Sequence, residues 1–118
     1  MQQHHLQKQQ QRQMLEMQQQ QQQMTQLQQQ MERRIDRESQ RSMNRSRRNN
    51  REEIQPVIRL DDGQTPTDHN VYFPENQVAL EALTGAHVVA LLNFYGLDVN
   101  GNIRARKDRL MRHLGVTL

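Results

Sequence analysis

Five cationic side chains lie close together near the C-terminus of this 118-residue chain. They fall within residues 103–114, where Asp108 is the single acid, and they are Arg104, Arg106, Lys107, Arg109 and Arg112. A guanidinium presents a planar fork of donors that matches the geometry of phosphate. If the stretch is helical, the free N–H groups of its first turn attract anions as well. The cluster therefore indicates binding to a polyanion, a class that includes DNA and RNA.

A second group of arginines lies in the middle of the chain. Residues 41–51 contain no acid and five arginines, namely Arg41, Arg45, Arg47, Arg48 and Arg51. Such a run can bind a nuclear-import receptor or nucleic-acid phosphate. The same residues can equally continue a solvated helix in which Glu and Arg pair at helical spacing. The sequence leaves both interpretations open.

The sequence supports no other kind of site. The chain has no cysteine, which excludes a thiol nucleophile and cysteine-ligated zinc. If Asp98–Asn102 belonged to a calcium loop, Lys107 would occupy the position of the bidentate Glu. Asp61, Asp62 and His69 indicate a polar loop in preference to an acid–base site. We therefore expect no enzymatic activity, cofactor, metal or small-molecule substrate, and the apolar runs are too short to predict a membrane span.

Two amphipathic helices are predicted to position the C-terminal cations. Thr84 is suited to cap a first helix over about residues 85–95. The apolar stripe of this helix consists of Val88, Leu91, Leu92 and Tyr95. Gly96 follows at the position of a left-handed C-cap, and residues 78–83 can form a short leading helix.

An extended connector, residues 97–102, and a second helix complete this region. Gly101 turns the chain at the end of the connector, Asn102 can cap the second helix, and Gly115 ends it. The residues expected to complete the apolar core are Leu97, Val99, Leu110 and Leu114. Residues 78–118 are therefore predicted to form the folded unit of the chain.

Composition divides the remainder of the chain into three segments. Residues 1–32 form a Gln-rich low-complexity tract, residues 33–53 an Arg-rich charged segment, and residues 54–77 a linker with three prolines. Within the linker, residues 57–60 and 71–73 could each form a short strand. The linker and the charged segment are not expected to contribute a core of their own.

The Gln-rich tract carries a heptad pattern. Met17, Met24 and Met31 recur every seven residues, and Leu27 lies between the last two. This is the a/d spacing that keeps one helix face toward a partner helix, although glutamines occupy other a/d positions. The tract therefore predicts weak coiled-coil potential and a homo-oligomer. A disordered low-complexity arm is the alternative that the composition leaves open.

A set of residues in the C-terminal third matches the pattern of a known motif. They are Leu83-Thr84, Val88, Leu91-Leu92, Tyr95-Gly96-Leu97, Val99, Gly101-Asn102, Lys107, Leu110 and Leu114. In this order they resemble the SAP motif, a helix–extended-loop–helix module of chromatin and RNA-processing proteins. The family usually places its lysine directly after the Gly-Asn pair, whereas here residues 103–106 intervene, which is close to one helical turn.

The resemblance implies a fold class and a function. The expected fold is mostly α-helical, with a small SAP-like module of two to three helices after a Gln/Arg-rich arm that is helical or disordered. The implied function is that of a non-enzymatic nuclear adaptor that binds DNA or chromatin through the second helix. The alternative is a protein-interaction module in which Val89, Leu92 or Phe94 contacts a partner protein.

Overall fold

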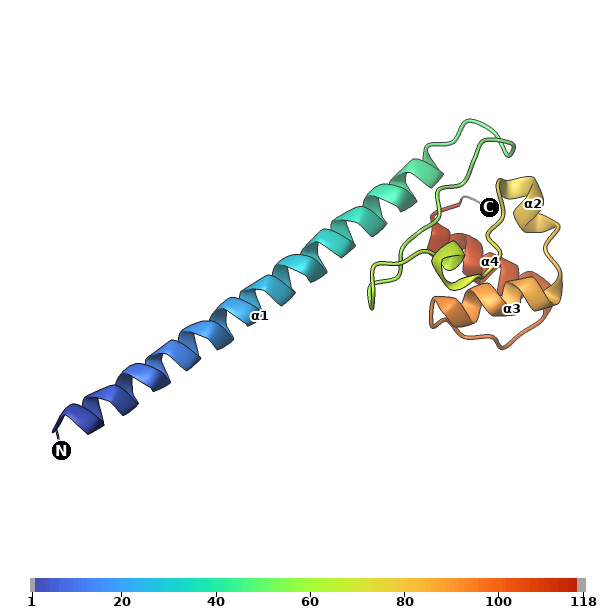
Figure 1. Ribbon diagram of the computed structural model, residues 1–118. Helices are drawn as coiled ribbons and strands as arrows, with labels where there is room; N and C mark the ends of the chain where they lie inside the picture. Colours follow the sequence, from blue (N-terminus) through green and yellow to red (C-terminus); the bar gives the residue numbers. More distant parts are fainter. Residues whose placement is uncertain (1, 117–118) are drawn as a thin grey trace. The chain divides into compact units, whose positions relative to one another are not determined.

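The computed structural model describes residues 2–116 and confirms a mostly α-helical chain. In chain order the helices are α1 (Gln2–Arg45), the 3-10 helix η1 (Pro66–His69), α2 (Gln77–Glu81), α3 (Gly85–Phe94) and α4 (Ile103–Leu114) (Figure 1). No strand forms among the described residues, where one isolated antiparallel bridge joins Glu53 to Asn76. The prediction of short strands at residues 57–60 and 71–73 was therefore wrong.

The Gln-rich tract is helical in the structure. Residues 2–45 form one helix, so the alternative of a disordered arm was wrong for this segment. Gln, Met, Leu, Arg and Glu all have good helix propensity, and neither Gly nor Pro occurs before Pro56. A helix satisfies its backbone groups within itself, so low hydrophobicity does not prevent this local structure.

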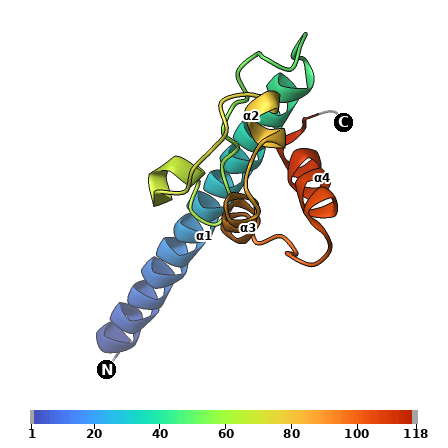
Figure 2. The ribbon, with the colours of Figure 1, turned by 90° about the vertical axis from the view of Figure 1, so that its right-hand side faces the viewer.

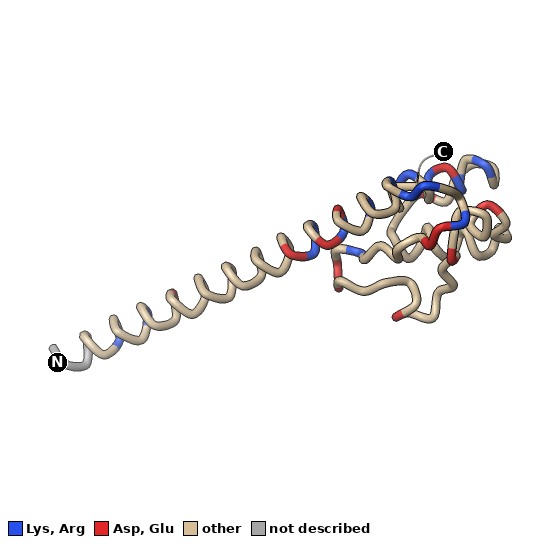
Figure 3. Tube along the Cα trace, turned by 90° about the horizontal axis from the view of Figure 1, so that it is seen from above, with Lys and Arg blue, Asp and Glu red and all other residues tan. Residues whose placement is uncertain are grey.

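Internal contacts divide the chain into two units, Met1–Glu32 and Arg33–Leu118. The second unit therefore contains the last turns of α1, the segment predicted to be a linker, and the C-terminal helices. Residues 1–32 carry two cations and two acids, so the net charge of +3 belongs to residues 33–118. Figure 3 shows the charged residues concentrated from Glu32 onward.

The core of the second unit combines α2, α3 and α4 with part of the predicted linker. Its buried members are Ile54, Val57, Leu80, Leu83, Val88, Leu91, Leu92, Leu110, Met111, Leu114 and Val116. The half-buried residues Tyr95, Leu97 and Val99 pack against it. Residues 54–77 are therefore part of the fold and not a loose linker. Two short helices cannot bury enough surface by themselves, and Ile54 and Val57 supply the missing cover.

Residues 55–61, called the extended segment below, run antiparallel to the last turns of α1. Polar side chains of α1 hold this segment in place. The Gln55 N–H donates to Asn44 Oδ1 at 2.7 Å, and the Ile58 N–H donates to Gln40 Oε1 at 2.9 Å. Arg33 Nη1 donates to the carbonyls of Leu60 and Asp61. These side chains replace a partner strand, which explains why an apolar β-like segment forms no sheet.

The helices α3 and α4 pack against each other (Figure 2). Capping residues set where each helix begins and ends. The side chain of Thr84 accepts from the His87 N–H at the start of α3, and Asn102 accepts from the Ala105 N–H at the start of α4. Gly96 and Gly115, with φ angles of 67° and 79°, follow the two helices in the left-handed region. The helix boundaries thus lie within one residue of those expected from the sequence.

Candidate functional site

The five cations of α4 do not form one free surface. Arg106 Nε donates to the Val99 carbonyl at 2.7 Å, and Arg109 Nη1 donates to the Asn100 carbonyl at 2.9 Å. Lys107 Nζ donates to the carbonyl of Glu81, at the end of α2. These three cations therefore hold the connector and α2 against α4. Their donors are partly used within the unit and are less available to a phosphate group.

Arg104 and Arg112 are the cations of α4 that remain exposed. No hydrogen bond or ion pair within residues 2–116 engages either guanidinium. The backbone carbonyl of Arg112 accepts from Arg41 Nη2 at 3.2 Å, a bond that does not involve the Arg112 side chain. Eight residues of helix separate the two arginines by about 12 Å along the axis. Of the predicted cation cluster, these two side chains can contact phosphate without breaking internal bonds.

The second group of arginines is also divided by the fold. Arg41 and Arg45 both contact Glu38, with nitrogen–oxygen distances of 2.9 and 3.6 Å. Arg47 Nε donates to the Asn44 carbonyl, and its Nη2 donates to Gln77 Oε1 at 3.0 Å. Arg48 and Arg51 are exposed. The structure therefore gives Arg41 and Arg47 roles in packing, while Arg45, Arg48 and Arg51 remain accessible.

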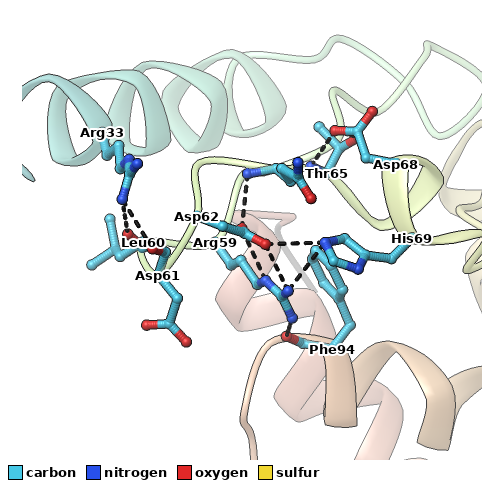
Figure 4. A network of polar contacts seen from close by, with 10 residues as sticks. Arg33, Arg59, Leu60, Asp61, Asp62, Thr65, Asp68, His69 and Phe94 are labelled. Carbon is cyan, nitrogen blue, oxygen red and sulfur yellow. Dashed lines mark hydrogen bonds and ion pairs between the residues drawn. The ribbon is translucent and has the colours of Figure 1, made fainter. Parts of the chain in front are cut away.

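A polar network joins Arg59 to Asp62 and His69, two residues of the predicted polar loop (Figure 4). Arg59 Nη2 lies 2.7 Å from Asp62 Oδ2, and His69 Nε2 lies 3.0 Å from the same oxygen. The hydrogen bond from Arg59 is the main reason that the pKa of Asp62 lies well below its usual range. The hydroxyl of Thr65 donates to Asp68. The network serves to position Arg59.

Arg59 is held on an aromatic surface by this network. Its guanidinium carbon lies 4.6 Å from the centre of the Phe94 ring, and Nη1 donates to the Phe94 carbonyl at 3.4 Å. Figure 4 shows the side chain between Asp62 and Phe94. Such a cation over an aromatic ring is stabilising when it is partly desolvated. Arg59 was missed in the sequence because an isolated arginine in an apolar stretch has no local signal of function.

His113 is a second residue that the sequence analysis did not assign to a site. Its ring lies 4.6 Å from that of Tyr95, measured between centroids. Burial lowers the pKa of His113 to about 4, and the positive charges of Arg41 and Arg37 act in the same direction. The imidazole is therefore neutral at pH 7. Its proximity to arginines of α1 depends on the tertiary fold and could not be read from α4 alone.

The residues predicted to contact a partner protein do not form an exposed surface. Leu92 is fully buried, and Phe94 is only 8% exposed. Val89 is half-buried. Phe94 is buried because Arg59 and His69 cover its ring. Of the three residues, Leu92 and Phe94 are therefore not available to a partner protein, and the interaction alternative depends on Val89.

The described residues contain no group of three or more side chains able to hold a metal ion. None of the helices from Gln2 to Leu114 combines the length and apolar character that a bilayer crossing requires.

Comparison with known proteins gave one match. The model of a protein family described as a protein of unknown function, DUF3294, matches residues 2–112. No curated protein and no solved structure matched the chain. The family match spans both α1 and the C-terminal unit.

Proposed function

We start from the fact that the chain belongs to DUF3294, a family of proteins of unknown function, and we propose that it is a non-enzymatic nuclear adaptor that binds DNA. In this proposal α3, the connector and α4 act as a SAP-like module. The observation that carries it is the pair of exposed arginines, Arg104 and Arg112, on a helix whose other cations fix its position. Residues 1–32 bring two modules together.

The arrangement of the module supports this proposal. A helix, an extended connector and a second helix follow one another, and Arg106 and Arg109 bind the connector through its carbonyl groups. These bonds make the connector and α4 a rigid support for the exposed side chains. Pre-organised cations lose less conformational freedom when they bind phosphate.

The positions of the two arginines suit a nucleic-acid backbone. Their separation of about 12 Å along the helix equals the axial rise of roughly three to four base pairs of a DNA duplex. Both arginines lie in the unit that carries the whole net charge of +3. Two phosphate contacts per copy predict weak binding without sequence preference, because phosphate contacts carry no base information.

The DNA proposal is tested by the double variant Arg104→Gln/Arg112→Gln. We expect its affinity for a short DNA duplex at low salt to fall by about tenfold or more, since both phosphate contacts are lost. Fluorescence anisotropy measures the affinity, and circular dichroism checks the fold. The matched control is Lys8→Gln/Arg12→Gln, which removes the same charge from exposed positions in the other unit.

Equal losses of affinity in the two double variants would show a general charge effect and would contradict the proposed site. Unchanged binding by Arg104→Gln/Arg112→Gln would contradict it as well. A single-stranded RNA of the same length distinguishes the alternative partner, because stronger retention of RNA than of duplex would replace DNA in the proposal.

Self-association is proposed through an exposed apolar stripe of α1. The side chains of Met17, Met24, Leu27 and Met31 are between 58% and 63% exposed in a single copy. They share the heptad face described above, so packing them against a second copy removes apolar surface from water. Two linked modules bind one duplex more tightly than one module alone, because the second contact becomes intramolecular.

Leu27→Gln tests this stripe, and Leu15→Gln is its matched control. Leu15 has a similar exposure of 57% but lies on the opposite side of the helix. Analytical ultracentrifugation should show a dimer of the unchanged chain that is weakened by Leu27→Gln and retained by Leu15→Gln. A monomer at every concentration would contradict the stripe, as would equal effects of both substitutions.

A further inference from the structure

A cavity of about 310 Å³ lies within the unit Arg33–Leu118. Its lining includes Arg37, Arg59, Asp61, Phe94, Tyr95 and His113. Arg37 comes from α1, Arg59 and Asp61 from the extended segment, and the remaining three from the ends of α3 and α4. Residues far apart in the sequence thus place two guanidinium groups, an imidazole and two aromatic rings around one space.

The lining of the cavity contains two guanidinium groups and one carboxylate, that of Asp61. Arg59 already has a partner in Asp62, at 2.7 Å. Arg37 has none at hydrogen-bond distance, because the nearest carboxylate oxygen, that of Glu38, lies 3.7 Å away. Asp61 is exposed and makes no ion pair with any residue between 2 and 116. Arg37 is therefore the cation whose charge is least compensated.

Two buried nitrogen atoms of α1 have no hydrogen-bond partner among the described residues. Nε of Arg37 and Nε of Arg41 are both inaccessible to solvent, and neither has a hydrogen-bond partner within residues 2–116. A buried donor without a partner costs about 1–3 kcal/mol. Because neither atom is accessible to solvent, a ligand in the cavity would contact Arg37 through its terminal guanidinium nitrogens.

We propose that this cavity binds a small phosphate monoester. The phosphate group would lie against Arg37, whose donor fork matches its oxygen atoms and has no hydrogen-bond partner within residues 2–116, with the charge of Arg59 beside it. The cavity is larger than a phosphate ion requires, so it can also hold a compact organic group beside Phe94 and Tyr95. This site is separate from the exposed arginines of α4 and does not depend on DNA binding.

His113 provides the reporter for this site. The charged and titratable groups that line the cavity with it or lower its pKa are Arg37 and Arg41 from α1, Arg59 and Asp61 from the extended segment, and Tyr95, directly after α3. Arg37 and Arg41 help to keep the pKa of His113 low. A bound dianion offsets their charge, so the imidazole should gain proton affinity and its NMR signals should shift.

The test is a titration of the full chain, followed through the ring signals of His113 at constant ionic strength. The probes are inorganic phosphate and phenyl phosphate, with sodium chloride as the reference. We expect saturable shifts with both phosphates and tighter binding of phenyl phosphate, because it fills the cavity beside the aromatic rings. A shift that does not saturate, or an equal shift with chloride, would overturn the proposal.

Two variants of α1 test whether Arg37 binds the phosphate group. Arg37→Gln should weaken phenyl phosphate binding by about tenfold or more, whereas Arg34→Gln, an exposed neighbour, should leave it unchanged. If Arg37→Gln unfolds, Arg37→Lys keeps the charge without the fork and should show an intermediate loss. Equal affinity in all variants would overturn the site. The variant Arg104→Gln/Arg112→Gln should retain phenyl phosphate binding, which separates this proposal from the DNA proposal.

Discussion

Gly115→Ala should destabilise the C-terminal unit by about 2–5 kcal/mol, through backbone strain of about 1–2 kcal/mol and overpacking of about 1–3 kcal/mol. Gly115 has a φ angle of 79° directly after α4. A Cβ atom at this position would lie 2.5 Å from the Arg41 carbonyl oxygen and 3.0 Å from the Arg41 Cα. The contact is with backbone atoms of α1, so no side chain can rotate to relieve it.

Gly96→Ala is the matched control for this substitution. Its φ angle of 67° is similar, but a Cβ there would meet no other atom of residues 2–116 within 4 Å. It should therefore show the strain of the left-handed conformation alone. Urea unfolding of both variants, followed by circular dichroism, measures the difference. Equal destabilisation would contradict the close packing of α4 against the last turns of α1.

Asn44→Ala is expected to destabilise the same unit by about 3 kcal/mol or more, because several buried groups lose their partners at once. Asn44 is only 1% exposed. Its Nδ2 donates to the Leu114 carbonyl at 2.7 Å and to the Gln55 carbonyl at 3.1 Å. Its Oδ1 accepts from the Gln55 N–H. One side chain thus joins α1 to the extended segment and to the end of α4.

Two further variants separate these contributions. Asn44→Asp keeps the acceptor for the Gln55 N–H but cannot donate to the Leu114 carbonyl, and it places a charge in a buried position. It should be at least as harmful as alanine. Ser42→Ala, at an exposed position on the same helix, should change the free energy of unfolding by no more than about 0.5 kcal/mol. A stable Asn44→Ala variant in thermal unfolding would contradict the role assigned to this residue.

The sequence predicts the parts of the fold that depend on local signals. The limits of α3 and α4 follow from Thr84, Asn102 and Gly115, because a cap or a left-handed residue acts on its own turn of helix. The helical periodicity also identifies Leu92 and Leu110 as apolar residues on inward faces, and both are fully buried. Such features need no knowledge of distant segments.

The packing of α1 against the extended segment could not be predicted in the same way. Arg33, Gln40 and Asn44 lie on one face of the helix, with spacings of seven and four residues. This face is polar, so a search for apolar periodicity passes over it. Its side chains bind backbone groups of residues 55–61, and backbone groups carry no signature in the sequence. A heptad stripe of polar side chains is the signal that could have indicated that α1 packs against this segment.

The same reasoning explains the division among the candidate cations. Helical spacing places Arg106 and Arg109 near one another on α4, but it does not show the carbonyl groups of the connector that they bind. Only the folded connector brings Val99 and Asn100 within reach. The exposed pair Arg104 and Arg112 therefore emerges from the structure and not from the count of charges.

The most direct test of the proposed function is the salt dependence of duplex DNA binding. With two phosphate contacts per copy, the slope of log affinity against log salt should be about −1.8 for each bound copy, and it should approach zero for Arg104→Gln/Arg112→Gln. The control Lys8→Gln/Arg12→Gln should keep the slope of the unchanged chain. A slope that is the same in the unchanged chain and in Arg104→Gln/Arg112→Gln would contradict the claim that these two arginines bind DNA.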